Sequence, residues 1–429
     1  MLTLASTLAM IDRLALNVMI GPVKRDLGGL TDFQVSLIMG IAFTGFYTIL
    51  SYPAGWIADR YSRRNLIAGG ITAWSIMTFL CGMANSFWTL FLARTGVGVG
   101  EATLGPAANS MLADYFKPTR LPLAIAIVSS APFVGQGLAN IIGAPLVEYL
   151  ESMPNMSVPL VGEVYSWQMV FILLGVPGVL IGFMMLTVRE PDRQGKKELD
   201  KRGVPFSEVW AFIKQRRWFF FLIFTAYLGL SIQGWSLFSW FIEFYIREHD
   251  WGRGEIGVTY GLIAMIIGIL GAVFSGAFAG WMIGRGSTDA PVRIVLWGTI
   301  ALIPLVVALW IVPDDMMGIA ILIPTTFLMA MPSGLIMTTL QMICPNELRG
   351  QTIAFYLISV NFLSYTFAPS LPPLLSELWF DSEDVKGAAI SIMAIFTYGG
   401  AAICLYFCLR HFREALEVAR AWTERSSST

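Results

Sequence analysis

The stretch that decides the fold is residues 88–113, which read WTLFLARTGVGVGEATLGPAANSMLA. It is apolar, rich in glycine and long enough to cross a bilayer as a helix, yet it contains Arg94 and Glu101. A spacing of seven residues is about two helical turns, so both charged side chains share one face, roughly 10 Å apart along the axis. Charges are costly in hydrocarbon, so this face must meet a partner or a water-filled cavity. Asp12 and Arg13 interrupt another apolar run and complete a neutral set of four charges.

The composition is that of an integral membrane protein. Of the 429 residues, 56% are hydrophobic and 13% are charged, whereas soluble proteins carry about 25% charged residues. The four cysteines lie in or beside apolar segments, as small core residues do, and the two histidines are far apart in the sequence. We therefore expect no metal site and no cofactor, and an intramembrane enzyme is a disfavoured alternative. The sequence contains no phosphate-binding loop for nucleotide hydrolysis.

Apolar stretches of spanning length occur twelve times, which predicts an all-α polytopic membrane protein with twelve transmembrane helices. The predicted spans are 2–21, 33–57, 65–84, 87–114, 121–150, 165–188, 217–246, 255–283, 292–312, 316–343, 351–378 and 387–410. The polar segment from Arg189 to Arg217 holds nine Lys or Arg residues and a short amphipathic helix at 206–216. It divides the chain into an N-terminal six-helix bundle (1–188), a cytoplasmic linker (189–216), a C-terminal six-helix bundle (217–410) and a basic tail (411–429).

Basic residues are distributed unequally between the two sides of the predicted membrane. The even-numbered connections and the tail hold 21 Lys or Arg residues, whereas the odd-numbered connections hold 5. The positive-inside rule therefore places both termini and the central linker in the cytoplasm. The pattern of residues 410–425 predicts a basic amphipathic helix on the inner membrane surface, with binding of a partner as the alternative. Because the chain starts within a span, we also expect a further segment before it.

The two halves of the chain repeat each other. The residues GWMIGR at 280–285 match GWIADR at 55–60, and 225 positions separate the two copies. Arg349, at the start of the eleventh span, matches Arg120, at the start of the fifth span, 229 positions earlier. Two matches at nearly one separation indicate two six-helix bundles related by an axis along the membrane normal, with the substrate site between them.

Residues 55–64, GWIADRYSRR, closely resemble the loop motif G-x-L-x-D-R-x-G-R-R of major facilitator superfamily transporters, with Ser62 where the family prefers glycine. Gly55 would let neighbouring helices approach, and Asp59 could cap a helix of the other half. The resemblance implies a latch that closes the cytoplasmic side in one state; a loop that only sets topology is the alternative. Gly284 replaces the acid in the second copy, so we expect an asymmetric latch. The expected latch residues are Gly55, Asp59, Arg60, Arg63, Arg64 and Arg120.

Residues 94–102, RTGVGVGEA, resemble the fourth-helix motif of this superfamily in the glycine-rich form typical of its Spinster branch. The pair Asp12-Arg13, the run REPDR at 189–193 and the run DYF at 114–116 match that branch as well. The resemblance covers essentially the whole chain and implies a lipid transporter. Lysophospholipids and sphingosine 1-phosphate are the substrates known for vertebrate members, and proton coupling is expected for bacterial relatives.

The four membrane charges suggest a proton switch. Burial disfavours the charged form of a carboxylate and a neighbouring arginine favours it, so its charge depends on the partner that it faces. We expect Asp12 and Glu101 to take up protons and to release Arg13 and Arg94 for an anionic head group or for rearranged helix contacts. Adjacent helix residues point about 100° apart, so one of Asp12 and Arg13 is expected to turn toward the fourth span. A purely structural ion-pair network is the alternative.

Polar and aromatic residues of the second half are candidates for lining the transport pathway, although each also suits helix packing. They are Gln233, Trp235, Ser239, Thr338, Gln341, Asn361 and Tyr365. The sequence favours a proton-coupled secondary transporter of an anionic amphiphilic lipid that works by alternating access. An antiporter of drugs or small organic anions is the main alternative, and a passive lipid scramblase is less favoured. We expect the protein to be a monomer in a bacterial inner membrane. Its expected partners are protons, the anionic substrate and membrane lipids, and no nucleic acid.

Overall fold

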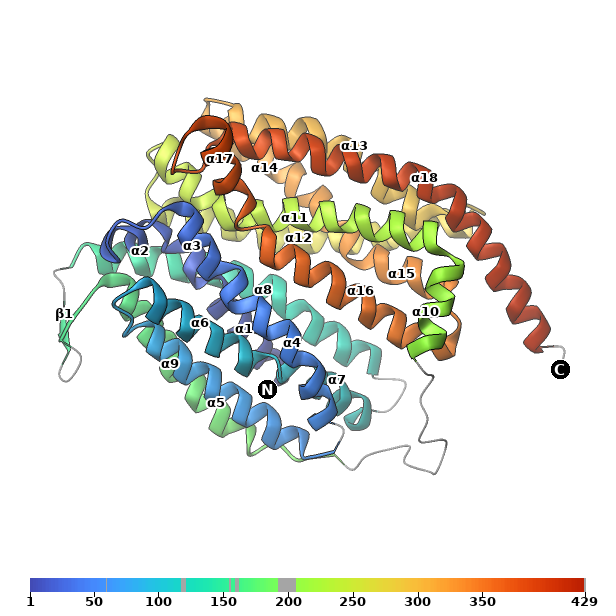
Figure 1. Ribbon diagram of the computed structural model, residues 1–429, viewed down its shortest axis with the longest axis horizontal. Helices are drawn as coiled ribbons and strands as arrows, with labels where there is room; N and C mark the ends of the chain where they lie inside the picture. The colour runs from blue at the N-terminus through green and yellow to red at the C-terminus, as the bar shows by residue number, and fades with distance from the viewer. Residues whose placement is uncertain (59, 117–120, 154–155, 159–161, 192–205, 428–429) are drawn as a thin grey trace. The chain divides into compact units, whose positions relative to one another are not determined.

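The computed structural model describes residues 1–58, 60–116, 121–153, 156–158, 162–191 and 206–427. Helices dominate this part of the chain and are labelled in chain order in Figure 1. A small antiparallel hairpin, β1 (Met156–Val158) with β2 (Gly162–Val164), lies in the connection between the fifth and sixth spans. No strand was expected in this connection. Valine favours extended backbone, and Val158 and Val164 each lie in one of the two strands.

Each of the twelve predicted spans coincides with one helix or with consecutive helices, and the short amphipathic helix predicted in the linker is also present. The first half contains α1 (Leu2–Ala15), η1 (Leu16–Val18), α2 (Ile20–Asp26), α3 (Asp32–Met39), α4 (Ile41–Ala58), α5 (Arg63–Cys81), α6 (Phe87–Glu101), α7 (Leu104–Tyr115), α8 (Leu121–Glu151) and α9 (Ser166–Met185). The linker helix α10 (Phe206–Gln215) is followed by α11 (Arg217–Glu248), α12 (Arg253–Gly284), α13 (Ala290–Ile311), α14 (Asp315–Ala330), α15 (Pro332–Ile343), α16 (Asn346–Phe367), α17 (Leu371–Phe380) and α18 (Gly387–Ser427).

Length and hydropathy identify many of these helices as membrane spans. Within the described ranges, seven helices are long and apolar enough to cross a membrane, and two bent pairs raise the number to nine. The remaining predicted spans, 65–84, 87–114 and 121–150, are helical as well, in α5, in α6 with α7, and in α8. Length explains the difference for α6, which has only 15 residues, whereas α5 begins with two arginines that lower its mean hydropathy.

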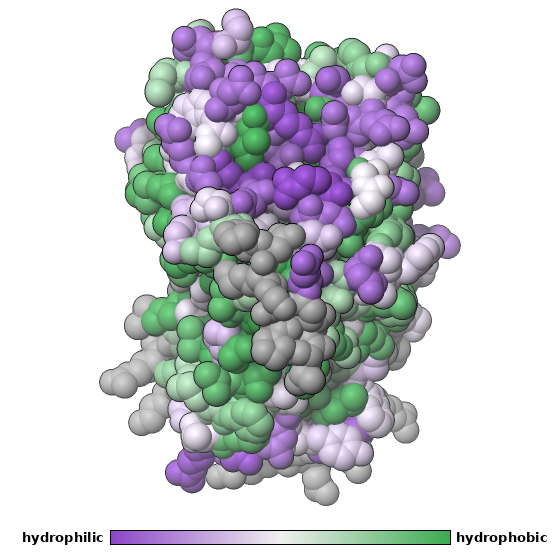
Figure 2. All heavy atoms as spheres, turned by 90° about the vertical axis from the view of Figure 1, so that its left-hand side faces the viewer, coloured by the Kyte–Doolittle hydropathy of each residue, from purple (hydrophilic) through white to green (hydrophobic). Residues whose placement is uncertain are grey.

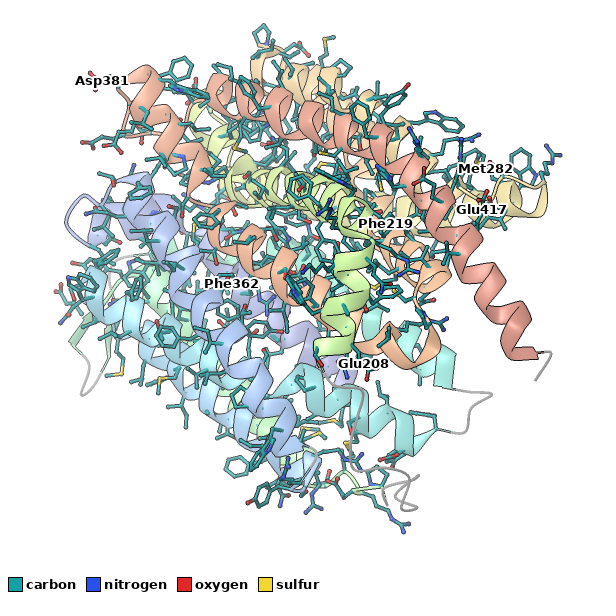
Figure 3. All side chains as sticks on the ribbon, turned by 45° about the vertical axis from the view of Figure 1, so that its right-hand side comes forward. Glu208, Phe219, Met282, Phe362, Asp381 and Glu417 are labelled. Atoms are coloured by element: carbon teal, nitrogen blue, oxygen red, sulfur yellow. The ribbon has the colours of Figure 1, made fainter. Side chains whose placement is uncertain are left out.

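Two predicted spans are broken helices. The first bends by 60° between the segment Leu2–Val18 and α2, and the eleventh bends by 44° between α16 and α17. The break in the first span places Arg13 in the last turn of α1. At the end of α17, Asp381 adopts a left-handed conformation with φ 50°, which an aspartate tolerates better than most residues (Figure 3). The sequence therefore located both spans, but not the changes of direction within them.

The chain divides into two compact units. Unit 1 contains Met1–Lys197, Phe238–Met265 and Tyr365–Lys386; unit 2 contains Glu198–Leu237, Ile266–Ser364 and Gly387–Thr429. These units differ from the predicted halves, because parts of α11, α12 and the region after α16 pack and form ion pairs with residues of the first half. The boundaries at 188 and 217 stay a prediction.

Small residues bring the helices of unit 1 into close contact. In this unit α5 packs against α6 and α9, α1 packs against α8, and α4 packs against α6. Gly175 of α9 shows why a small residue is needed, because a Cβ atom there would lie 2.7 Å from the carbonyl oxygen of Ser75 on α5. Real Cβ atoms do not approach backbone oxygens so closely, so any larger residue would push α5 and α9 apart.

In unit 2, α13 packs against α14, α15 and α18. The last helix continues without a break from Gly387 to Ser427, so the predicted span at 387–410 and the helix predicted at 410–425 form one helix. Beyond the predicted end of its span, Phe412 is fully buried and its ring stacks on that of Phe219, with ring centroids 6.0 Å apart. Phe219, labelled in Figure 3, lies near the start of α11. Ala415 and Leu416 are also buried, so this part of α18 has an apolar face that packs on the protein.

Candidate functional site

Glycines of α6 bring its charged residues against the neighbouring helices of unit 1. A Cβ atom at Gly98 would lie 2.4 Å from the carbonyl oxygen of Phe43 on α4, and one at Gly100 would lie 2.7 Å from a backbone nitrogen of α5. The missing side chains therefore let both backbones approach α6 directly. As a result, Arg94 and Glu101 of α6 are both buried.

Asp12 and Arg94 form a buried ion pair between α1 and α6. The Nη1 atom of Arg94 lies 3.2 Å from Oδ1 of Asp12, and the two side chains are 0% and 3% exposed, respectively. The same guanidinium donates hydrogen bonds of 3.2 Å to the backbone carbonyl oxygens of Asp12 and Arg13. Thr78 of α5 donates its hydroxyl to Oδ2 of Asp12. Thr78 was not among the residues predicted from the sequence.

Arg13 and Glu101 form the second ion pair between α1 and α6. The Nη2 atom of Arg13 lies 2.9 Å from Oε2 of Glu101, and the side chain of Arg13 is 16% exposed whereas that of Glu101 is 1% exposed. Three aromatic rings surround the guanidinium: its Cζ atom lies 4.6 Å from the ring centroid of Phe43, 5.1 Å from that of Tyr47 and 5.6 Å from that of Tyr365. Such contacts with aromatic faces favour the cation.

The four charged residues predicted from the sequence are therefore together, in two separate pairs. One of Asp12 and Arg13 was expected to turn toward the fourth span; both pair with α6. This is possible because Arg94 and Glu101 lie two turns apart and meet side chains that leave α1 in different directions.

The seven predicted lining residues differ in their surroundings. Tyr365 lies against Arg13, whereas the side-chain oxygen of Gln233 accepts a hydrogen bond of 3.3 Å from Thr397. Thr338 donates to the backbone of its own helix at 3.2 Å. Ser239 is buried, Trp235 and Asn361 are half-buried, and Gln341 is exposed. Lining of a pathway by these residues stays a prediction.

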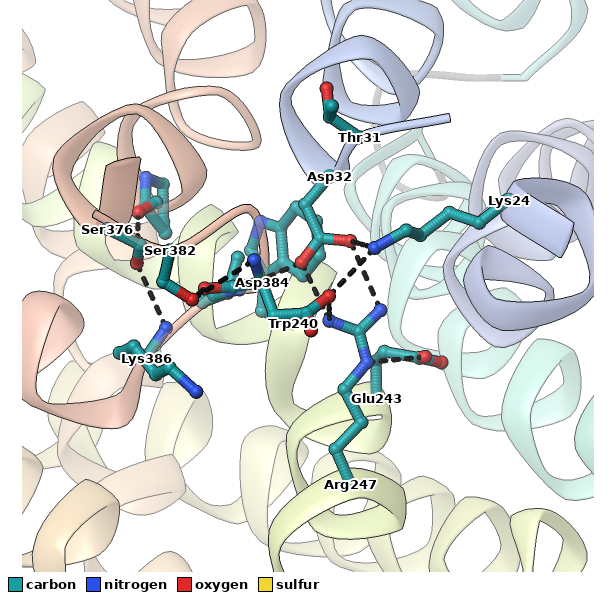
Figure 4. A network of polar contacts seen from close by, with 12 residues as sticks. Lys24, Thr31, Asp32, Trp240, Glu243, Arg247, Ser376, Ser382, Asp384 and Lys386 are labelled. Atoms are coloured by element: carbon teal, nitrogen blue, oxygen red, sulfur yellow. Dashed lines mark hydrogen bonds and ion pairs between the residues drawn. The ribbon is translucent and has the colours of Figure 1, made fainter. Parts of the chain in front are cut away.

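A second group of charges, the Asp32 cluster, was not predicted. It consists of Lys24, Asp32, Glu243, Arg247 and Asp384 (Figure 4). Asp32 is fully buried and lies 2.8 Å from Nζ of Lys24 and 2.7 Å from Nη1 of Arg247. Arg247 also contacts Glu243 at 2.9 Å and Asp384 at 3.2 Å. Figure 2 shows the face on the left-hand side of Figure 1, which carries the label α2, and hydrophilic residues gather in its upper part.

The Asp32 cluster connects residues that are distant in the sequence. Asp32 and Arg247 lie 215 positions apart, and the backbone nitrogen of Val385 donates to Asp32 over 353 positions at 2.8 Å. The hydrogen bond from Lys24 lowers the pKa of Asp384, against the opposing effect of burial. Lys24 and Arg247 are two of the five basic residues in the odd-numbered connections, and a single sequence gives no signal for their partners.

The predicted latch residue Arg63 forms a compact charge cluster that we call the first staple. Arg63 begins α5, is almost fully buried, and donates to Glu190 at 3.0 Å and to Asp114. Glu190, which follows α9, also accepts bonds from the hydroxyl of Ser62 at 2.9 Å and from the backbone nitrogen of Arg64 at 2.7 Å. Although burial acts in the opposite direction, these donors lower the pKa of Glu190. The first staple therefore ties the start of α5 to the segment after α9.

The second half contains a similar charge cluster, which we call the second staple. In it, the acid and the arginine have exchanged places. Asp289 at the N-terminus of α13 accepts bonds from Arg413 of α18 at 2.7 Å and from Arg293 at 2.8 Å. These bonds lower the pKa of Asp289 although its burial acts against them. Asp289 follows Arg63 by 226 positions and Arg413 follows Glu190 by 223, which is close to the separation of the sequence repeats. Each half therefore joins its third helix to the chain at the end of its sixth.

The repeated motif also makes the same local contact in both copies. The guanidinium of Arg60 lies 4.0 Å from the ring centroid of Trp56, and that of Arg285 lies 4.0 Å from the ring centroid of Trp281. A Cβ atom at Gly55 would lie 3.7 Å from Pro106, an ordinary contact distance, so packing in this structure does not require glycine there. Two further predicted latch residues, Asp59 and Arg120, lie outside the described residues. The latch function stays a prediction.

Metal ligands do not cluster in the part of the chain that the structure describes, where no group of three or more His, Cys, Asp or Glu residues could hold an ion. The arrangement of charges is instead that of buried ion pairs within helices of a membrane protein. Buried ion pairs of this kind suit the binding of charged groups and conformational change.

The comparison with protein families is decisive, because residues 2–369 match the family model described as Major Facilitator Superfamily. The chain belongs to this superfamily. Among solved structures of the superfamily, a bacterial homologue of the human lysosomal transporter Spinster, inward-facing and unoccupied, matches with a TM-score of 0.78 and 24% identity. The match covers 98% of this chain and 96% of that chain. The predicted fold, with its two six-helix bundles, is thereby confirmed.

Curated relatives within the superfamily include several transporters. An MFS-type efflux pump of Mycolicibacterium smegmatis is 27% identical over 98% of this chain and 94% of its own length. Protein spinster homolog 1 of Rattus norvegicus is 30% identical over 57% of this chain and 48% of that protein. A probable galactarate/D-glucarate transporter of Escherichia coli is 28% identical over 58% of each chain. Together with the structural match, these relatives support the placement in the Spinster branch that the motifs predicted.

Proposed function

We propose that this transporter carries an anionic amphiphilic lipid of the lysophospholipid or sphingosine 1-phosphate type and couples its movement to protons. The observation that carries the proposal is the pair of Arg13 and Glu101. The guanidinium is partly exposed and surrounded by aromatic rings, whereas the carboxylate is almost fully buried. An accessible cation next to a buried acid suits the binding of an anion, because protonation of the acid can control that binding.

The proposed mechanism follows from the cost of burying charge. Burial disfavours the ionised form of Glu101, and Arg13 at 2.9 Å favours it. When Glu101 takes up a proton, Arg13 loses its counter-ion in a poorly solvated site, and an anionic head group becomes a favourable replacement. When the head group leaves, the ion pair forms again and the proton is released. The two states differ in their helix contacts, which is the requirement for alternating access.

The surroundings of Arg13 favour an amphiphile over a fully polar anion. Phe43, Tyr47 and Tyr365 offer apolar ring surface around the guanidinium, so a substrate with both a charged head and an apolar portion fits the chemistry of the site. The resemblance of the sequence motifs to the Spinster branch implies the same substrate class. We further propose that the protein acts as a monomer in a bacterial inner membrane.

An antiporter of drugs or small organic anions is the second candidate. The relative from Mycolicibacterium smegmatis, which aligns over nearly the whole chain, is named an efflux pump, and another relative is named a transporter of sugar diacids. Arg13 would serve such an anion equally well. The two candidates differ in whether an acyl chain is required, and a passive scramblase differs from both because it would not respond to a proton gradient.

The test is uptake of a lysophospholipid and of sphingosine 1-phosphate into proteoliposomes, with a pH gradient imposed in either direction. The parent is compared with Glu101→Gln, with Arg13→Gln and with Glu163→Gln, a control change at an exposed acid on β2. We expect gradient-dependent uptake by the parent and the control, loss of the gradient response in Glu101→Gln, and loss of uptake in Arg13→Gln.

Two results would overturn the proposal. Lipid uptake by the parent that does not depend on the pH gradient would favour a scramblase. Saturable uptake of galactarate, without lipid uptake, would favour the organic-anion antiporter instead.

A further inference from the structure

We propose that the turn between α10 and α11 binds the head group of an anionic phospholipid of the cytoplasmic leaflet. The residues that form this site, which we call the basic corner, are Lys214 of α10, Arg216 in the turn, and Arg217, Trp218 and Phe221 at the start of α11. The basic corner shares no residue with the ion pairs between α1 and α6. The inference therefore goes beyond the proposed function and does not depend on it.

Aromatic packing holds α10 against other helices of unit 2. Phe212 of α10 is buried, and its ring centroid lies 5.8 Å from that of Phe220 on α11. The ring centroid of Trp210 lies 6.3 Å from that of Phe355 on α16. Figure 1 shows α10 running across the direction of α11, with a sharp turn between the two helices. The cations at this turn are therefore held by packed helices.

The cations of the basic corner have no acidic partner. In the part of the chain that the structure describes, no Asp or Glu forms an ion pair with Lys214, Arg216 or Arg217. The guanidinium of Arg216 lies 4.3 Å from the ring centroid of Phe212, and that of Arg217 lies 5.8 Å from the ring centroid of Trp218. These aromatic contacts favour a cation but leave its charge uncompensated.

Other arginines on the predicted cytoplasmic side of unit 2 do have acidic partners. Arg293 lies 2.8 Å from Asp289, and Arg410 lies 3.0 Å from Glu414. Arg410 is largely exposed to solvent, whereas Arg216 is half-buried, so the lack of a counter-ion costs more at Arg216. Burial lowers the pKa of Arg216, which is the direction expected for a cation without a counter-ion.

A second cation lies near Arg216. Both Arg216 and Arg349 of α16 interact electrostatically with the buried thiol of Cys344. Arg349 donates to the backbone carbonyl oxygen of Cys344 at 3.4 Å, and among the described residues its buried Nε has no hydrogen-bond partner. Like charges repel each other strongly where solvent is partly excluded, and an anion near both of them would replace this repulsion by attraction. The charges therefore favour an anionic ligand.

The aromatic side chains favour a lipid as the source of that anion. Trp210 and Trp218 are 51% and 56% exposed, and Phe221, one turn after Trp218, is 60% exposed. Exposed tryptophans at the ends of membrane spans lie at the level of the lipid head groups. Along α11, Arg217, Trp218 and Phe221 thus offer a cation, an interfacial ring and an apolar ring in the order of a head group and its acyl chain. Anionic lipids of the cytoplasmic leaflet attract basic residues at this level.

The experiment measures binding of phosphatidylglycerol to the full chain in neutral detergent by native mass spectrometry. Phosphatidylcholine with the same acyl chains and inorganic phosphate are measured in parallel. The parent is compared with Arg216→Met, with Arg217→Gln, with the double change, and with Arg410→Gln, a control at a cation that has an acidic partner. Methionine keeps an unbranched side chain against Phe212 and removes the charge.

We expect the parent to prefer phosphatidylglycerol to phosphatidylcholine and not to bind inorganic phosphate. From the usual contribution of one basic residue, each single change should weaken binding of phosphatidylglycerol about fivefold, and the double change about twentyfold. Arg410→Gln should bind like the parent. Equal affinity for the two lipids, or unchanged binding in the double change, would overturn the proposal. Binding of inorganic phosphate as tight as that of the lipid would show a site for a free anion instead.

Thermal unfolding separates a lipid ligand from an acidic partner within the protein. In delipidated protein, Arg216→Met should keep the Tm of the parent or raise it slightly, because the change removes an uncompensated cation. Phosphatidylglycerol at about a hundredfold excess over Kd should raise the Tm of the parent by about 5 °C, and that of the double change by less than half as much. A clearly lower Tm of Arg216→Met without lipid would mean that an acid of the protein pairs with Arg216, and would refute the proposal.

Discussion

Removal of the end of α18 tests whether the tail is a structural part of unit 2. A chain that stops after Leu409 loses Phe412, Arg413 and Leu416, whereas a chain that stops after Val418 keeps all three. Phe412 is fully buried and Leu416 is nearly so. We expect the shorter chain to be strongly destabilised and the longer one to behave like the parent.

The magnitude follows from the contacts that are lost. Burial of Phe412 and Leu416 contributes about 2 kcal/mol for each side chain. The bond of Arg413 to Asp289 adds about 1 kcal/mol, because the arginine is half exposed and solvent screens the pair. The sum is about 5 kcal/mol, which corresponds to a decrease of about 10 °C in Tm for a protein of this size.

The assay is thermal unfolding of the purified protein in detergent, followed by tryptophan fluorescence and by retention of a monodisperse peak. The change Phe412→Ala gives an intermediate test, with an expected loss of about half the effect. A chain ending at Leu409 that shows the Tm and yield of the parent would refute the reasoning, and would restore the view of the tail as a peripheral surface helix.

Three further outcomes follow from the geometry of unit 1. Gly98→Ala should abolish folding or transport, because its Cβ would meet the carbonyl oxygen of Phe43 at 2.4 Å, whereas Gly105→Ala, with open space around it, should leave Tm unchanged or slightly raised. The lowered pKa of Glu190 means that its stabilisation is present above about pH 4.5 and is lost on acidification, so the Tm difference between the parent and Glu190→Gln should shrink as the pH falls. Asp32→Asn should cost about 3 kcal/mol in unfolding experiments, because two cations lose their shared buried partner; an unchanged Tm would argue against this.

The sequence predicted the helices and the charged site because each leaves a local signal. An apolar run of spanning length needs no partner to be recognised, and charges such as Arg94 and Glu101 stand out within such a run. The sequence alone could not predict which of these charges pair with each other. The pairing depends on the rotation of α1 about its axis and on the break after η1, and Asp12 and Arg13 point in different directions although they are neighbours.

Residues whose contacts are with partners distant in the sequence leave no such local signal. Thr78 is an ordinary helix residue until the structure places its hydroxyl against Asp12. Asp32 and Arg247 look like solvated charges at the ends of spans, and their contact depends on a separation of 215 positions. The continuity of α18 beyond residue 410 was also not predicted, because it depends on a tertiary contact, the packing of Phe412 on Phe219.

The reversed polarity of the two staples has a consequence for the history of the molecule. If the halves arose by duplication, the ancestral segment carried one arrangement, and one copy has since exchanged its arginine and its acid. Reversal at a single position would have placed two like charges in contact, one of them on a buried side chain (Arg63 or Asp289), so both positions are expected to have changed nearly together. Residues 63 and 190, and likewise 289 and 413, are thus expected to vary as pairs among related sequences. A chimaera that moves a helix from one half into the other would need to transplant both members of the pair.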